Sequence, residues 1–535
     1  MLLFCSSQPH RPTTDPRATA IVAIVALLLV AAAALAWSTR YLPGTDGPNH
    51  LITAWIFRDL MWNPGSLNGK FYQFRPDFFT TFGTEAVGWV AIPILGPLAT
   101  EKLLFTVAIV GVPAAIIAGI YAAAGRMSPF MVLALPYGYT QTLADGNFNY
   151  LLGLILQLGI LAAILGQHRL PNGRMTAAIA ICGVALALTH PAPTVLLLFL
   201  AGTLVLGRSI RLWSDDRPAA LRMIVVYAAA VLPMIAVLVL FLIFSPASSM
   251  AYQRPAYLRL REFLIQYELY KLGRHELFLA MALSAMMIAT AVTAVRARWT
   301  WKFHDRDWLL VLSFASFVLY MISPNKMSGG DAFVARIEIL PWILLLMWLA
   351  VQPLPGWVGT GILATGTLLQ CAFLAGAYHT HAIANKDIKR YFELAAAIPR
   401  DTIVVPVIGD TRALDPTGWA IALRARPFDH LYNVVAIQNG TVFLKNWNAH
   451  FRISNVQFRP ELDPYPDLWS GDLAAGLERY ERRTDVHPDG ILIWRLARDS
   501  REWAELKPLL EARYQLALEM SGGRTISAYY RRVVH

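Results

Sequence analysis

The chain has 535 residues, of which 56% are hydrophobic and 15% are charged, and its mean hydropathy is +0.46. This composition is too apolar for a soluble protein of this length, and it predicts a protein of the lipid bilayer. The formal charge of +11 fits a multispan protein with Lys and Arg in its cytoplasmic loops. We predict no nucleic-acid partner, because no basic face is interleaved with stacking aromatic residues.

Apolar windows of about 18 residues or more recur along the chain, and this length allows a helix to cross roughly 30 Å of hydrocarbon. The first window follows a short basic leader, and its length favours an uncleaved anchor over a signal peptide. We expect about eleven spans, near residues 20–38, 101–124, 129–144, 148–166, 175–190, 193–207, 222–244, 276–296, 307–322, 333–350 and 357–377.

Two features fix the expected orientation. The segment 85–98 is short and broken by proline, so we expect it to lie at the outer face as a helix instead of spanning. The loops near 167–175, 207–222 and 295–308 are rich in Lys and Arg, and this span count places all of them in the cytoplasm with the N-terminus. The basic segment 245–276 falls outside, where the charge rule is weaker for a loop of that length.

The character of the chain changes at about residue 383. Apolar runs shorten to strand length at 402–408, 490–496 and 526–534, and helical patterns lie at 388–398 and 501–520. This alternation predicts a soluble α/β domain at 383–535 after a transmembrane domain at 1–382, which includes amphipathic helices at about 46–98. An odd number of spans places the C-terminal domain in the periplasm.

The unusual polar residues all fall on the outer side of this topology. A charged side chain at mid-bilayer costs about 2.5–3.5 kcal/mol on insertion scales, so these residues are expected to line a wet cavity instead of facing lipid. They are Asp46, His50, Asp145, Asn147, Asn149, Tyr150, His190, Lys326, Asp331, Arg336 and Glu338.

Each of these residues also has a structural explanation. Asp46 is well placed to cap a helix over 47–61 that has an apolar stripe for the membrane surface. Asp145 lies in an ordinary turn sequence, and His190 precedes a proline at a helix end. Arg336 could snorkel to lipid head groups. Their convergence on one face is therefore the stronger signal.

The stretches "TDGPNH", "GNFNYLLGL", "THPAP" and "ARIEILPWILLL" resemble those of the GT-C superfamily of polytopic glycosyltransferases. The acidic residue in the first outer loop, the amphipathic helices behind it, the many spans and the C-terminal α/β domain agree with this resemblance. The paired acidic motif of many members is absent, because Thr45 precedes Asp46 and Gly47 follows it. The resemblance leaves open whether a divalent cation takes part, with Asp46 and His50 as its candidate ligands.

The resemblance implies transfer of a sugar from a polyprenyl-phosphate donor to a hydroxyl acceptor at the outer face of a bacterial inner membrane, with inversion. Asp46 would be the general base, assisted by His50. Arg336 and Lys326 would bind the donor phosphate. The cavity residues would be Asp145, Asn147, Asn149, His190 and Asp331.

Two other functions use similar residues. A transporter or flippase of a lipid-linked or anionic substrate also carries polar groups inside its bundle. An outer-face glycan ligase or polymerase makes nearly the same demands on sequence. The sequence specifies neither the sugar nor the acceptor.

Overall fold

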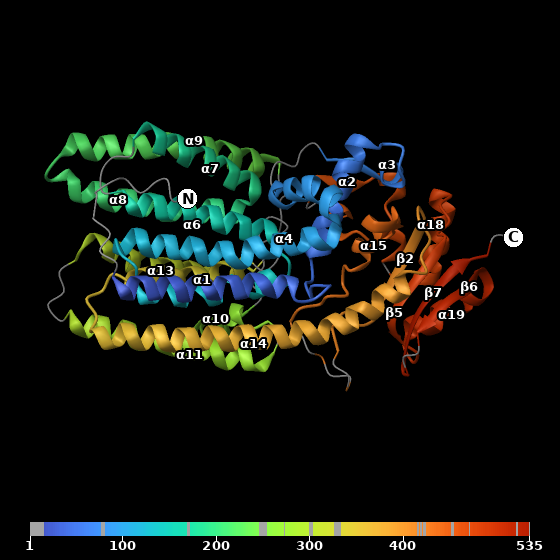
Figure 1. Ribbon diagram of the computed structural model, residues 1–535. Coiled ribbons are helices and arrows are strands. Elements are labelled where there is room, and N and C mark those ends of the chain that lie inside the picture. Colours follow the sequence, from blue (N-terminus) through green and yellow to red (C-terminus); the bar gives the residue numbers. More distant parts are fainter. Residues whose placement is uncertain are drawn as a thin grey trace.

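The computed structural model describes residues 15–75, 81–167, 172–244, 254–271, 273–298, 303–325, 333–414, 417, 420, 424–450, 454–469, 471–520 and 523–533. Two of the expected site residues, Lys326 and Asp331, lie outside the described residues. Figure 1 shows a bundle of long helices, with a small sheet beyond one end of it.

The bundle confirms the expected polytopic helical fold. Within the described residues, seven helices are long and apolar enough to cross a membrane. They are α1 (Pro16–Trp37), α4 (Phe82–Ala124), α6 (Phe148–Gly166), α8 (Pro191–Trp213), α9 (Arg217–Phe244), α11 (Arg274–Ala297) and α14 (Gly356–Ala395). Shorter helices fall on other expected spans, namely α7 (Gly173–Thr189), α12 (Trp308–Ile322) and α13 (Phe333–Leu349).

The expected span at 129–144 is not a single α-helix. It consists of the 3₁₀-helix η2 (Pro129–Gly138) and the short helix α5 (Gln141–Ala144), and residues 130–144 are buried in the bundle. Pro136 cannot donate a backbone hydrogen bond, which disfavours a regular α-helix here. The prediction of a spanning helix was therefore wrong at this segment.

The segment 85–98 is helical, as expected, and it is joined to the next span. Helix α4 consists of two helical parts that meet at Gly96, where φ is +76° and a side chain would be strained. The first part packs against helix α2 (Gly47–Trp62), because Gly88 leaves room for the Cβ of Ala54.

The shorter elements α2 and α3 (Leu67–Phe71) lie at the end of the bundle that faces the sheet (Figure 1), and β1 (Tyr72–Phe74) follows α3. The elements α10 (Ala256–Leu264) and η3 (Tyr267–Leu269) precede α11. The apolar residues of the stripe predicted for α2 are largely buried, among them Leu51 and Ile56. Strand β1 pairs antiparallel with β4 (Val456–Phe458), so the first loop is tied to the C-terminal part of the chain. The short 3₁₀-helix η4 (Asp305–Asp307) precedes α12.

The C-terminal part contains a mixed five-stranded sheet with strand order β3-β2-β5-β7-β6. Its strands are β2 (Ile403–Ile408), β3 (Val442–Phe443), β5 (Gly490–Ala497), β6 (Tyr514–Met520) and β7 (Thr525–Arg532). Strand β2 is parallel to β3 and β5, and β7 is antiparallel to β5 and β6. The helical elements around it are α15 (Tyr432–Asn439), α16 (Trp447–His450), η5 (Pro460–Leu462), α17 (Tyr465–Leu468), α18 (Leu473–Thr484) and α19 (Arg501–Arg513).

The helix predicted at 501–520 ends early. Helix α19 stops at Arg513, and residues 514–520 form β6, which pairs with β7. Tyr514, Leu516 and Leu518 alternate with polar or small residues, and this period of two fits a strand. Pairing with β7 therefore outweighs the helix propensity of this segment.

Helix α14 joins the bundle to the sheet without interruption (Figure 1). Its 40 residues make it about 60 Å long, roughly twice the thickness of a bilayer core. The helical pattern predicted at 388–398 is the end of this helix, so α14 runs through the domain boundary expected at residue 383.

Candidate functional site

Asp46 stands at the start of α2, at the end of the bundle that faces the sheet. It occupies the N-cap position, but its carboxylate caps no helix N–H. The carboxylate instead pairs with His430, whose Nε2 lies 3.1 Å from Asp46 Oδ1. The Asp46 side chain keeps 37% of its surface exposed. Helix capping therefore does not account for this carboxylate.

The charge state of Asp46 follows from its neighbours. Burial alone raises the pKa of Asp46, but the hydrogen bond from His430 and the charges of His430, His50 and Arg336 outweigh burial. The net pKa of Asp46 lies below its usual value, so this carboxylate is ionised at neutral pH.

The backbone around Asp46 is fixed by the connection between α5 and α6. The amides of Thr45 and Asp46 donate to the carbonyls of Ala144 and Asp145 at 3.1 and 2.7 Å. Gly146 packs so closely that a Cβ there would come within 2.3 Å of the Gly47 amide nitrogen. These contacts set the direction in which the Asp46 side chain projects.

His50 lies one turn along α2, as predicted, and interacts electrostatically with Asp46. Burial lowers the pKa of His50, and the positive charges of Arg336 and His430 lower it further. The carboxylate of Asp46 raises it, but not enough to reverse the shift. Its Nδ1 atom is buried and has no hydrogen-bond partner among the described residues. A neutral imidazole with an unpaired ring nitrogen is therefore available at the site.

Arg336 reaches the same site from the first turns of α13. Its Nη2 donates to Asn147 Oδ1 at 3.1 Å, and its Nη1 lies 3.5 Å from His190 Nε2. Its Nε–H is buried and has no partner within the described part of the chain. This arrangement holds the guanidinium group inside the bundle end and excludes snorkelling to head groups.

His190 connects two helices as well as contacting Arg336. It ends α7 and begins α8, and its Nδ1 accepts the amide hydrogen of Ala192 at 3.1 Å. Because Nδ1 accepts this hydrogen bond, the ring orientation is fixed with Nε2 toward Arg336. The structural interpretation of His190 is therefore confirmed, and the same ring also contacts Arg336. Tyr150 lies beside it and donates its hydroxyl hydrogen to the Arg336 carbonyl.

Asp145 lies in the predicted turn, next to the same cluster. Burial raises the pKa of Asp145 to about 7, and the negative charges of Glu268 and Asp46 act in the same direction. Its carboxylate accepts a hydrogen bond from Gln141. The site thus contains one ionised carboxylate and a second that changes its protonation near neutral pH.

Asn149 does not face this cluster. Its amide oxygen accepts the amide hydrogen of Thr84 at 2.6 Å, and its Nδ2 donates to Thr81 and Glu85. Asn149 therefore holds the start of α4 against α6, and these contacts give it a structural role.

Sequence reasoning missed Glu268 and Arg424. The Glu268 carboxylate accepts two hydrogen bonds from Thr142, and its amide donates to Glu338 Oε1 at 3.0 Å. Arg424 Nη1 donates to the carbonyls of Tyr267 and Tyr270, each at 2.8 Å, and its Nη2 lies 3.9 Å from Glu268 Oε1. These contacts join η3 to the C-terminal part of the chain beside the site.

The fit of a metal ion can be tested against these contacts. Within the described ranges, no group of three or more His, Cys, Asp or Glu side chains is arranged to hold a metal ion. Asp46 Oδ1 is engaged by His430, and among the described residues of the cluster His50 adds one unpaired ring nitrogen. This donor set does not fit a protein-bound metal ion.

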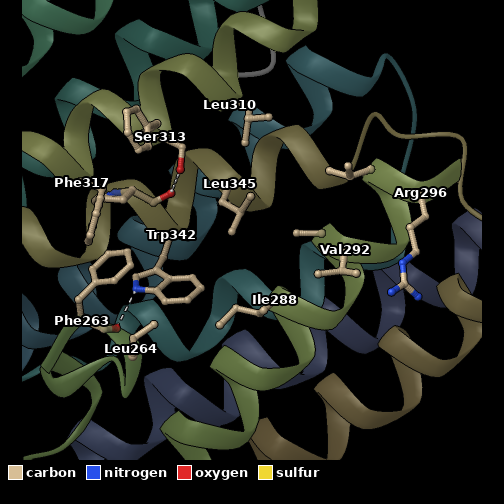
Figure 2. Close-up of a pocket in the computed structure, with 14 residues that line it drawn as sticks. Phe263, Leu264, Ile288, Val292, Arg296, Leu310, Ser313, Phe317, Trp342 and Leu345 are labelled. Carbon is tan, nitrogen blue, oxygen red and sulfur yellow. Dashed lines mark hydrogen bonds between the residues drawn. The ribbon is translucent and has the colours of Figure 1, made fainter. Parts of the chain in front are cut away.

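An apolar groove of about 540 Å³ lies on the flank of the bundle between α11, α12 and α13, with α10 at one end (Figure 2). Phe263 and Trp342 stack at 4.9 Å, and Trp342 Nε1 donates to the Phe263 carbonyl. Trp342 lies six residues beyond Arg336 on α13, a rise of about 9 Å. Leu264 and Phe314 are exposed at the groove, so it opens on the side of the bundle.

Comparison with solved structures identifies the fold. ArnT from Cupriavidus metallidurans in the apo state aligns with a TM-score of 0.56 at 13% identity, covering 96% of this chain and 98% of ArnT. ArnT bound to undecaprenyl phosphate aligns with a TM-score of 0.53 over the same shares. The arabinofuranosyltransferase AftD from Mycobacteria aligns with a TM-score of 0.53 at 14% identity.

The alignment with AftD covers 96% of this chain but 40% of AftD, so the chain spans less than half of that protein. No protein-family model and no curated protein matches the sequence. At these identities the likeness to ArnT and AftD establishes the fold of this chain alone. The chain shares the polytopic helical fold of these proteins, which agrees with the resemblance to the GT-C superfamily noted in its sequence.

Proposed function

We propose that this protein is an inverting membrane glycosyltransferase that moves a sugar from a polyprenyl-phosphate donor to a hydroxyl acceptor. The observation that carries the proposal is the placement of an ionised, partly exposed carboxylate, Asp46, and a guanidinium group with a buried Nε–H, Arg336, in one cluster. The GT-C fold supports the same class of reaction.

The reaction needs one general base. The acceptor hydroxyl oxygen attacks the anomeric carbon, the bond from that carbon to the phosphate oxygen breaks, and the hydroxyl proton passes to Asp46. The departing polyprenyl phosphate is stable as an anion and needs no general acid. A positioned base contributes about 10²–10⁴-fold to such a step.

His50 then binds or orients the acceptor. Its low pKa keeps the imidazole neutral at pH 7, and its unpaired Nδ1 is available to a hydroxyl group beside Asp46. This role fits better than proton abstraction from the acceptor by His50, because the ionised Asp46 lies one turn away on the same helix.

Arg336 binds the donor phosphate and stabilises the charge that forms as the phosphate departs. Its planar fork of donors suits a phosphate, and its Nε–H is unpaired among the described residues. Lys326 stays a second candidate for this role. ArnT was solved with undecaprenyl phosphate, and we infer a donor of the same class here.

The prenyl chain would lie in the apolar groove between α11, α12 and α13. Each buried methylene favours binding by about 0.8 kcal/mol, so the groove can anchor a long chain without polar contacts. The rise of about 9 Å along α13 separates Trp342 from Arg336, and a few isoprene units would cover it.

We place the reaction at the outer face of a bacterial inner membrane, with the N-terminus in the cytoplasm. The basic loops near 167–175, 207–222 and 295–308 support this orientation. In this proposal residues 1–382 bind the donor, and residues 383–535 lie in the periplasm over the site.

The proposal is tested in proteoliposomes with pentosyl and hexosyl polyprenyl phosphates labelled in the sugar. A cell-envelope extract of lipids and glycans supplies the acceptors, and transfer is measured as label that becomes resistant to mild acid. Asp46→Asn should lower transfer at least about 10²-fold, because the amide cannot accept the proton.

Asp59→Asn is the matched control. Asp59 is a buried carboxylate on the same helix, and it accepts a hydrogen bond from Asn68 at 2.9 Å, outside the cluster. Near-normal transfer by Asp46→Asn would remove Asp46 from catalysis. Equal losses in both variants would point to damage to α2 instead of loss of a base. Transfer that survives a chelator would show that no divalent ion is essential.

A further inference from the structure

The C-terminal part of the chain reaches the bundle end through residues 424–430, here called the strap. Arg424 donates to the carbonyls of Tyr267, in η3, and of Tyr270, just after it, and the amide of Arg426 donates to Thr45 Oγ1 at 2.9 Å. His430, at the end of the strap, pairs with Asp46. The strap thus contacts the segment directly before α2, at the candidate base Asp46 and at Thr45 before it.

His430 is itself held from behind. Its Nδ1 lies 3.4 Å from the hydroxyl of the buried Tyr432, and its carbonyl accepts the amide hydrogen of Asn433. Phe428, two residues earlier, is buried against Tyr391 and Trp494. The imidazole is 12% exposed, so it has little freedom to turn away from Asp46.

The geometry points to His430 as a positioning residue: through its Nε2 contact, 3.1 Å from Asp46 Oδ1, we propose that it fixes the rotamer of the Asp46 side chain. This inference rests on the proposed function. His430 is not the base, because Nε2 faces Asp46 and Nδ1 faces Tyr432, which leaves no ring nitrogen for a substrate. One oxygen of Asp46 is held, and the other is left for the acceptor.

The other groups around Asp46 define what His430 adds. His50 comes from α2, Arg336 from α13, Asp145 from the α5–α6 connection, and Glu101 from α4, beside Gly47. Among the groups that act on the pKa of Asp46, His430 supplies the hydrogen bond, and burial opposes it. Loss of His430 should therefore raise the pKa of Asp46.

The test compares His430→Ala and His430→Gln with the wild type in the transfer assay. His430→Ala should lower kcat by about 10- to 100-fold with little change in the donor KM, the range for groups that orient a reacting residue. The acid limb of its kcat/KM profile should move to higher pH. His430→Gln retains a hydrogen-bond donor and should recover part of the rate.

His450→Ala is the matched control. His450 Nδ1 lies 2.8 Å from Asp463 Oδ2, and the His450 ring stacks on Tyr465. Like His430, His450 therefore pairs with an aspartate, and it lies in the same part of the chain. It should leave the pH profile unchanged. The double variant Asp46→Asn with His430→Ala should lose no more rate than Asp46→Asn, since His430 acts through Asp46.

The outcomes separate the two proposals. Full activity of Asp46→Asn would end the assignment of the base. An inactive Asp46→Asn combined with a wild-type pH profile for both His430 variants would overturn the positioning role alone. Additive losses in the double variant would also overturn it.

Discussion

Replacement of Arg336 tests the electrostatic half of the proposed reaction. In Arg336→Gln the fixed positive charge is lost, and so are the fork of donors and the unpaired Nε–H. Removal of one preorganised donor to developing negative charge typically costs about 2.7–4 kcal/mol, or 10²–10³ in kcat. The hydrogen bond from the charged guanidinium group to Asn147 contributes about 1.5–3 kcal/mol, and its loss lowers stability.

The assay is the initial rate of transfer at saturating donor, with thermal unfolding in detergent measured in parallel. Arg336→Lys keeps the charge without the planar fork, so its rate should lie between those of the wild type and Arg336→Gln. Arg208→Gln is the matched control. Arg208 donates to the carbonyls of Ile164 and Gln167 at the opposite end of the bundle. The Arg208→Gln variant should unfold at a lower temperature than the wild type, without a comparable loss of kcat.

The reasoning would be refuted if Arg336→Gln kept a rate close to that of the wild type. It would equally be refuted if Arg208→Gln slowed transfer by the same factor, because the effect would then be one of stability.

Two further predictions concern residues next to Asp46. Gly146 and Gly125 both have positive φ, but a Cβ at Gly146 would meet the Gly47 amide nitrogen at 2.3 Å and one at Gly125 would meet nothing. Gly125→Ala should cost about 1–2 kcal/mol of stability without slowing transfer. Gly146→Ala should lower stability and also slow transfer, and equal transfer rates in the two variants would contradict this. The pKa of Asp145 is raised to about 7 in the folded protein, so folding favours the protonated carboxyl group. The stability of the protein therefore falls as the pH rises through 7. Asp145→Asn should therefore raise Tm at pH 8 more than at pH 5.5, and an equal change at both would contradict the assignment.

Much of the bundle could be predicted because hydrophobic length marks each span. The segment 129–144 was mistaken for a spanning helix because its composition is apolar, while its prolines shift it to a 3₁₀-helix. The strand at 514–520 was mistaken for the end of a helix because its partner β7 decides its conformation. The local sequence pattern of a segment does not indicate which distant strand it pairs with.

The sequence allowed the candidate site to be predicted to the extent that the expected spans place its residues at the same end of the bundle. Asp46, His50, His190 and Arg336 meet because each follows or begins an apolar segment at the same end of the bundle. His430 gave no such signal, since it lies in a loop of the C-terminal part with no periodicity around it.

Glu268 and Arg424 were missed for a similar reason. They belong to segments far apart in sequence that meet only because η3 and the strap pack together. A single histidine or arginine in a loop becomes interpretable once its partner is known.

The unbroken course of α14 limits how substrates can enter. No proline interrupts this helix, and the β1–β4 pair forms a second attachment between the two parts of the chain. Rotation of the sheet away from the bundle would require bending the helix and separating those strands. We therefore expect the acceptor to arrive through rearrangement of short loops around a stationary frame, and large hinge opening to be absent from the catalytic cycle.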